Sequence, residues 1–244
     1  MKSSWLGVAL VLLASRAYAD APLYVAPAPA AERIAAAAEP QRPWTYAVPI
    51  AMALDPASAG SWSHSGDTRI WRARLHSPGA HNLSLHFDQL SLPEGAELWL
   101  RSSDGQHQQG PYGTEYNERG ALWTALIVGD TLELELRQPS VAPAPVLRLA
   151  AVMHGFRGAS PRSNTKANRA GSCNIDVACL EADPYDPAVR ASVLVQIGGT
   201  GTCSGTLLNN TADDRRPFVL TANHCQISRS NQNSVVIYFN YQRS

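Results

Sequence analysis

The residue best suited to carry chemistry is His224, which follows an apolar run at 217–220 in the string Thr-Ala-Asn-His-Cys. The run predicts the end of a strand, and a second short strand is predicted at 202–208. A disulfide between Cys203 and Cys225 would join the neighbour of His224 to that strand and would contribute roughly 3 kcal/mol to stability. Because a general base must lie about 3 Å from its nucleophile, a histidine on a turn fixed in this way is a candidate general base.

Two strings around this histidine, Cys-Ser-Gly-Thr-Leu-Leu from residue 203 and Phe-Val-Leu-Thr-Ala-Asn-His-Cys from residue 218, resemble the histidine region of trypsin-like serine endopeptidases. With Gly-Ser-Cys-Asn-Ile-Asp-Val-Ala-Cys at 171–179, the resemblance is closer to the secreted bacterial lysyl endopeptidases, and it extends from about residue 171 to the end. It implies that His224 is the general base of a Ser-His-Asp triad, without metal or cofactor, and that cleavage follows Lys or Arg. The alternative is a core or surface histidine beside a structural disulfide.

The resemblance also implies residues that this sequence does not contain. In the family the serine nucleophile and the orienting aspartate follow the histidine, and no Gly-Asp-Ser-Gly or Gly-Ser-Ser-Gly string is present. Asp176, Asp183 and Asp186 precede the histidine, so none of them is assigned to the triad. The family partners of Cys173 and Cys179 would also lie further along the chain, so we expect these two to be free thiols or bonded to each other.

The sequence ends at Ser244, inside a strand-like run that begins at Ser234. We therefore expect an incomplete protease precursor that has no turnover by itself. The resemblance implies protein or peptide substrates, and it implies that the region before the protease domain packs on that domain.

The first 19 residues predict a secretory signal peptide. Lys2 precedes an apolar run at 5–14 that is too short to span the ~30 Å core of a bilayer, and Ala17-Tyr18-Ala19 is a small-x-small signal for cleavage after Ala19. An uncleaved membrane anchor is the alternative, and no later stretch suits a membrane span. Export would explain the four cysteines, because disulfides persist outside the cytoplasm.

Composition narrows the class of partner. The 244 residues carry 20 basic and 20 acidic side chains, so net charge does not favour nucleic acid or an anionic membrane as a partner. Residues 20–44 are rich in Ala and Pro and predict a linker with little fixed structure, apart from a short helix at 31–39.

Residues 45–156 alternate apolar and polar side chains with a period of two, as in Leu132, Leu134 and Leu136 around two glutamates. Turn signals separate five to eight such runs, which predicts an antiparallel β-sandwich. The arrangement loosely resembles the pro-regions of some secreted bacterial proteases, which implies that residues 45–156 are a β-sandwich pro-region.

The sequence of this region suggests two other candidate functions. His76, His81 and His86 would have to converge to hold a metal ion, which their predicted positions do not favour. Exposed Trp99 and Tyr112 could form a platform for a sugar ring, although aromatic residues on strands more often belong to a core. The alternative function is thus a non-catalytic, secreted interaction or carbohydrate-binding protein with a vestigial protease tail.

Residues 157–169 contain four basic residues and no acidic one, which predicts an exposed linker with a processing site after Lys166 or Arg169. A solvated tether is the alternative. Residues 170–244 are expected to form part of the first β-barrel of a trypsin-like protease domain, with strands at 191–197, 202–208, 218–220 and 234–241.

Overall fold

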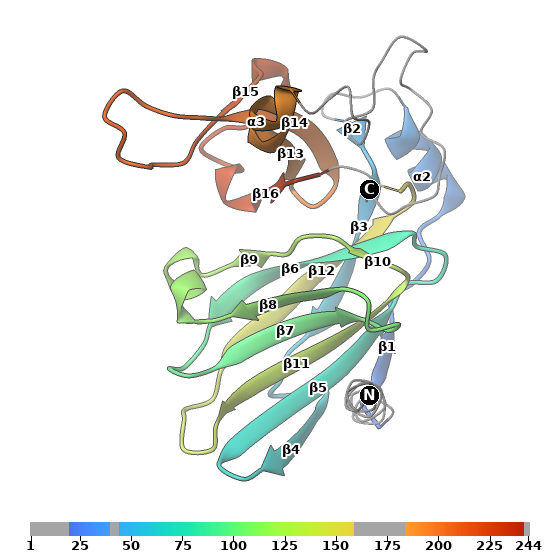
Figure 1. Ribbon diagram of the computed structural model, residues 1–244. Helices are drawn as coiled ribbons and strands as arrows, with labels where there is room; N and C mark the ends of the chain where they lie inside the picture. The colour runs from blue at the N-terminus through green and yellow to red at the C-terminus, as the bar shows by residue number, and fades with distance from the viewer. Residues whose placement is uncertain (1–19, 40–43, 159–183, 242–244) are drawn as a thin grey trace, which may run out of the picture.

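The computed structural model describes residues 20–39, 44–158 and 184–241, which are mostly antiparallel strands in three sheets with a few short helices (Figure 1). The prediction of an all-β protein is confirmed. No helix in the described part of the chain is long and apolar enough to cross a membrane. Several predicted features lie outside the described residues: the signal segment with Ala19, Lys166, Arg169, Cys173 and Cys179.

The first sheet has the order β1-β5-β11-β7-β8, with β4 paired to β5. All of its pairs are antiparallel except β1 with β5. Its strands are β1 (Leu23–Val25), β4 (Ser61–Ser65), β5 (Thr68–His76), β7 (Glu97–Ser102), β8 (Gln108–Tyr112) and β11 (Thr131–Pro139).

The second sheet has the order β10-β6-β12-β3, with β9 paired to β6. Its strands are β3 (Ala47–Leu54), β6 (Asn82–Ser91), β9 (Leu122–Trp123), β10 (Ile127–Val128) and β12 (Val146–Gly155). Ten strands, β3 to β12, thus lie between residues 47 and 155, more than the five to eight expected. The excess comes from short strands, such as β9 and β10, which are too brief to show a period in the sequence.

One apolar core joins the facing sides of these two sheets. Leu132, Leu134 and Leu136 of β11 are fully buried in it, together with Leu83 and Leu85 of β6. The alternation in the sequence identified these positions because successive side chains of a strand point to opposite faces. The alternate residues of β11 face outward, where Glu135 lies among arginine side chains.

The third sheet lies above the second in Figure 1 and has the order β15-β14-β13-β16. Its strands are β13 (Ser192–Ile197), β14 (Gly201–Leu208), β15 (Phe218–Thr221) and β16 (Val235–Phe239), preceded by the helix α3 (Asp186–Ala191). These bounds agree with the strands expected in the C-terminal region to within one or two residues at most ends. Cys225 packs with Val193, Val195 and Ile197 in a small core on one face of this sheet.

The structure differs from the expected linker at 20–44. In its described part, β1 pairs with β5, and the hydroxyl of Tyr24 accepts a hydrogen bond from the N–H of Gly60 at 2.7 Å. The helix α2 (Ala31–Ala38) lies where a short helix was expected. The alanine-rich composition concealed β1, because a three-residue strand gives no periodic signal.

The N-terminal part of the chain, up to residue 158, contacts the third sheet directly. The strand β2 (Trp44–Thr45) pairs with the start of β14, and the N–H of Tyr46 donates to the carbonyl oxygen of Thr200 at 2.8 Å. In addition, the buried side chain of Gln196 donates to the carbonyl oxygen of Thr124 at 3.1 Å. The contact between the two parts therefore combines strand pairing with hydrogen bonds from buried side chains.

Arg157 belongs to this contact between the two parts. The sequence had predicted instead that it lies in an exposed linker. Its guanidinium donates to the carbonyl oxygens of Thr45, at 3.4 Å, and of Ala38, and it lies 5.1 Å from the ring centre of Trp44. The carbonyl oxygen of Arg157 accepts a hydrogen bond of 2.7 Å from the side chain of Asn82. The folded unit therefore extends at least through Arg157.

Candidate active site around His224

The strands that lead to His224 approach each other closely because Gly205 has no side chain. Gly205 of β14 lies opposite Thr221 of β15, and a Cβ atom at this position would come within 2.9 Å of the carbonyl oxygen of Leu220. The glycine in the Cys-Ser-Gly string thus allows β15 to pair at this point. β15 then ends at Thr221, directly before the histidine turn.

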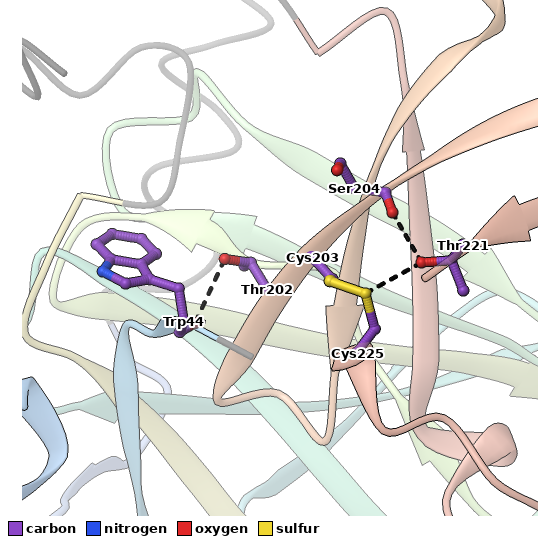
Figure 2. The surroundings of a disulfide bond; sticks show 6 residues. All are labelled: Trp44, Thr202, Cys203, Ser204, Thr221 and Cys225. Carbon is purple, nitrogen blue, oxygen red and sulfur yellow. Dashed lines mark hydrogen bonds between the residues drawn. A yellow bond between two sulfur atoms is a disulfide. The ribbon is translucent and has the colours of Figure 1, made fainter. Parts of the chain in front are cut away.

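The turn that carries His224 is one turn of 3-10 helix, η3 (Asn223–Cys225). Its backbone is closed by two hydrogen bonds of 3.0 Å, from the N–H of Cys225 to Ala222 and from the N–H of Gln226 to Asn223. The hydroxyl of Thr221 donates to the carbonyl oxygen of Ser204 at 2.8 Å and also lies 3.1 Å from the sulfur of Cys225. Thr221 thus links the turn to β14 (Figure 2).

A disulfide joins Cys203 of β14 to Cys225 at the end of the turn, with their Cα atoms 5.9 Å apart (Figure 2). The pairing is the one considered from the sequence. Cys225 is fully buried, whereas His224 beside it is exposed. The bond therefore fixes the backbone next to the histidine and leaves the imidazole accessible to solvent.

The imidazole of His224 makes no hydrogen bond or ion pair with the residues that the structure describes. A ring nitrogen of His224 and the sulfurs of Cys203 and Cys225 lie within 4.8 Å of one another, a grouping that could resemble a metal site. However, the two sulfurs are bonded to each other. Neither offers a thiolate, which is the form of cysteine that binds metal ions.

The described aspartates of the C-terminal part do not orient His224. Asp186 lies in α3 and forms an ion pair of 2.7 Å with Arg190. Asp214 accepts hydrogen bonds from the side chain of Asn210, at 2.6 Å, and from the N–H of Arg216, at 3.0 Å. Asp176 and Asp183 lie outside the described residues. The described chain thus supplies the candidate base without an orienting carboxylate.

The three histidines considered as metal ligands, all in the N-terminal part, make separate contacts. His76 forms a hydrogen bond of 2.9 Å with the hydroxyl of Thr131, and His86 stacks on Trp123 with ring centres 3.7 Å apart. His81 lies in a bend between strands. Within the described residues, these three side chains do not form a cluster of potential metal ligands.

Trp99 and Tyr112, considered from the sequence as a platform for a sugar ring, do not form an exposed pair. Tyr112 packs against the apolar core, and its hydroxyl donates to the side chain of Gln109 at 3.0 Å. Burial raises the pKa of Tyr112, and Tyr116 raises it further. Trp99 is half-buried and donates to Glu97 at 3.1 Å. The burial of Tyr112 removes one of the two rings that such a platform would need.

Sequence reasoning missed Trp44, although this residue lies near the histidine turn. Trp44 pairs with Thr202, the residue that immediately precedes Cys203 of the disulfide. The one available signal was a tryptophan in an otherwise Ala- and Pro-rich region. Such a signal does not identify a pairing partner 158 residues away.

Comparison with known proteins finds one family match, which lies in this part of the chain, and a curated relative. Residues 167–244 match the family described as lysyl endopeptidase, C-terminal domain. A curated lysyl endopeptidase of Pseudomonas aeruginosa is 29% identical over 148 residues, which cover 55% of this chain and 31% of that protein. No solved structure matches the chain.

The chain spans about a third of the length of this curated relative. The family match includes β13 to β16, the disulfide and His224, and it begins after the two sheets of the N-terminal part. The chain is thus related to the lysyl endopeptidases, and the family match lies in its C-terminal region.

Proposed function

We propose that this chain is the N-terminal portion of a secreted serine endopeptidase precursor, and that His224 is the general base of its Ser-His-Asp triad. The signal segment would direct export, and residues up to 158 would form a β-sandwich pro-region. The enzyme would hydrolyse peptide bonds after Lys or Arg through an acyl-enzyme intermediate.

One observation carries the proposal: an exposed histidine on a turn that a disulfide holds to the neighbouring strand. A general base has to present its imidazole to a nucleophile and to substrate while its backbone stays fixed. The buried sulfur of Cys225 and the hydroxyl of Thr221 provide the fixed backbone, and the exposure of His224 provides access. The match to the lysyl endopeptidase C-terminal domain covers this region.

The surface of the third sheet supports its assignment to a larger β-barrel. Leu208, Phe218 and Leu220 alternate with half-buried residues along β14 and β15, and they are 41%, 42% and 60% exposed. Leu208 lies opposite Phe218 in the strand register, so these two share one face of the sheet. An apolar face of this kind favours packing against further protein.

The pro-region would act through the contacts made by Gln196, Thr200 and Tyr238, which bind it to the third sheet. In this arrangement it assists folding of the protease part or keeps it inactive before processing at Lys166 or Arg169. His224 is exposed in the described part of the chain, so these contacts leave its imidazole accessible.

The proposal is tested on the protein encoded by the complete reading frame that contains this sequence. Its hydrolysis of lysyl and arginyl peptide esters is measured before and after the change His224→Ala. Loss of a triad member lowers the rate about 10⁴- to 10⁶-fold, because the remaining groups only bind and polarise the substrate. Residues 1–244 alone are expected to give no turnover.

A matched control is His64→Ala, which removes another exposed histidine, located in β4. This variant should retain the full rate. The ratio of lysyl to arginyl ester hydrolysis gives the side-chain preference. Hydrolysis that survives His224→Ala, or a complete protein without esterase activity, would contradict the proposal.

A further inference from the structure

The outward face of the first sheet carries charged side chains in rows. Successive side chains of β5, β11 and β7 alternate between the core and this face, and the three strands lie side by side in Figure 1, away from the third sheet. The strand register places two rows across them: Arg74, Glu133 and Arg101, and then Arg72, Glu135 and Trp99. The face thus combines several arginines with one tryptophan.

The carboxylate of Glu135 holds the arginines of this face in place. It accepts hydrogen bonds from Nε of Arg72 at 2.7 Å and from Nε of Arg137 at 2.6 Å, and Nη1 of Arg101 lies 4.0 Å from it. Glu135 is only 1% exposed because these long side chains cover it. Three guanidinium groups share this one carboxylate, which leaves an excess of positive charge around it.

Arg137 is the most accessible of the three arginines around Glu135. Its side chain is 44% exposed, against 17% for Arg72 and 20% for Arg101. Its Nε and Nη2 atoms each lie 2.6 Å from one oxygen of Glu135, so this edge of the planar guanidinium is turned to the carboxylate. The other edge, between the two Nη atoms, can pair with a second carboxylate through two parallel hydrogen bonds. Arg137 is therefore positioned to bind an anionic group from solvent.

Trp99 is a diagonal neighbour of Arg137 on the same face. Arg137 lies opposite Glu97, two residues before Trp99, and diagonal neighbours have Cβ atoms about 7–8 Å apart. The indole N–H donates to Glu97 at 3.1 Å, and a Cβ atom at Gly110 of β8 would come within 3.3 Å of the ring. The ring is thus held against β8 at a glycine. Because Trp99 is only half-buried, part of its surface remains open to solvent.

A hollow in the surface begins at Glu97, the residue that fixes the indole. Its other walls include Pro111 of β8 and the turn with Thr114 and Glu115. The two carboxylates accept hydrogen bonds from hydroxyl groups, and the hydroxyl of Thr114 both donates and accepts them. Next to each other, this surface therefore offers a partner for a carboxylate, an aromatic ring and a hollow that suits hydroxyl groups.

We propose that the outward face of β7 and β11 binds an acidic polysaccharide, with a sugar ring packed on Trp99, a sugar carboxylate on Arg137 and sugar hydroxyls in the hollow beside Glu97. In this arrangement Arg137 provides the second contact that the buried ring of Tyr112 does not. The proposal goes beyond the proposed function and does not rest on it.

The other anionic polymers fit this surface less well. Nucleic acid is not favoured, because the chain has equal numbers of basic and acidic side chains and the face itself contains Glu97, Glu133 and Glu135. An acidic peptide would pair with Arg137 but would lack the ring and the row of hydroxyl groups that suit Trp99 and the hollow. An acidic polysaccharide has carboxylates, rings and hydroxyls together.

The test uses the full 244-residue chain and polygalacturonate, a polymer in which each sugar carries a carboxylate. Isothermal titration calorimetry measures its binding to the wild type, to Trp99→Ala and to Arg137→Ala. We expect each change to weaken binding about 10-fold or more, because one removes the ring and the other removes the partner of the carboxylate. A matched control is Arg148→Ala, which removes an exposed arginine paired with Asp88 in the second sheet and should bind like the wild type.

Two further polymers test the class of ligand. Dextran has sugar rings and hydroxyls without charge, and polyglutamate has carboxylates without sugar rings. Both should bind to the wild type about 10-fold or more weakly than polygalacturonate, since each lacks one of the recognised groups. Equal binding of dextran would overturn the role of Arg137, and equal binding of polyglutamate would overturn the choice of a polysaccharide.

Thermal unfolding of each variant checks that it is folded. The loss of Arg137 removes a partner of the buried Glu135, so if Arg137→Ala does not fold, Arg137→Gln replaces it, because glutamine keeps a donor but has no guanidinium fork. If Trp99→Ala does not fold, Trp99→Leu fills its space without a ring. The expected losses of binding are the same. Unchanged binding of polygalacturonate to both folded variants would refute the site. Because no hydrolysis is measured, that failure is distinct from a failure of the protease assignment.

Discussion

The side chains of Gln196 and Tyr238 hydrogen-bond to each other across two adjacent strands of the third sheet, β13 and β16. The same tyrosine hydroxyl accepts a hydrogen bond of 2.7 Å from the N–H of Leu126, and the same glutamine donates to Thr124 at 3.1 Å. Two side chains thus bind a short backbone segment of the N-terminal part. Burial raises the pKa of Tyr238, so the hydroxyl stays protonated and can donate.

The change Tyr238→Phe should weaken this contact. It leaves the N–H of Leu126 and the oxygen of Gln196 without their partner, and a buried group left in this way costs about 1–3 kcal/mol. Urea unfolding of the full chain measures the loss. Tyr185→Phe, at a tyrosine that is 66% exposed, should change stability very little. Equal effects of the two changes would show that the hydroxyl of Tyr238 does not stabilise the contact.

Gly199 offers a test that separates backbone strain from packing. Gly198 and Gly199, in the β13–β14 turn, have positive φ angles of 58° and 64°, so alanine is strained at both. A Cβ atom at Gly199 would also come within 2.7 Å of Met153 in the second sheet, whereas at Gly198 the nearest atom is 3.9 Å away. We expect Gly199→Ala to lower the midpoint of thermal unfolding more than Gly198→Ala. Equal shifts would mean that Gly199 does not lie tightly against Met153.

Glu133 predicts a pH dependence of stability. Burial raises its pKa to about 7, against the opposing effects of Arg74 and Arg101 on the neighbouring strands, while Glu135 raises it further. The folded chain therefore holds this proton more tightly than the unfolded chain. The resulting stability is fully present below the unfolded pKa of about 4.5 and is lost as the pH rises through about 7.

The change Glu133→Gln should remove this dependence, because glutamine stays neutral. Since Glu133 is half-exposed, solvent screening reduces the expected gain at pH 8 to about 1 kcal/mol. Unfolding free energies at pH 5 and pH 8 check the prediction, with Glu118→Gln as a control at an exposed glutamate. A gain that is the same at both pH values would contradict it.

Removal of the disulfide by the double change Cys203→Ala and Cys225→Ala should destabilise the third sheet. The bond closes a loop with a sequence separation of 22, for which chain entropy predicts about 3 kcal/mol. Unfolding by urea, followed through the protection of amides in β13 and β14, measures the loss. Mass mapping of the oxidised protein checks the pairing itself, and a Cys179–Cys203 link would contradict both the bond and the fixed position of His224.

The sequence predicted those features that depend on neighbouring residues. The alternation of Leu132, Leu134 and Leu136 identified buried positions, because the period of a strand is set by its own backbone. Glu135 lies between these leucines on the opposite face of the strand, yet it is only 1% exposed. Arg72 and Arg137 approach its carboxylate to 2.7 and 2.6 Å, and the coverage by these long side chains is not visible in a local pattern.

The sequence also located the histidine turn but not its surroundings. The string around His224 predicts a strand followed by a turn, and the structure has β15 followed by η3. The pairing of Trp44 with Thr202 could not be predicted in this way, because two residues carry no period and their partner is far along the chain. Long-range strand pairing is decided by tertiary packing.

β2 and β15 lie one after the other on the edge of β14 opposite β13, and this arrangement has a consequence for the order of assembly. During synthesis from the N-terminus, Trp44 is made 158 residues before Thr202. Domains generally fold as units as they emerge, so the two sheets of the N-terminal part are complete before β14 exists. When β14 emerges, β2 and Arg157, which contacts both residues of β2, have already been made. The contact can therefore form as soon as the first residues of β14 are made, because the other strand is already present.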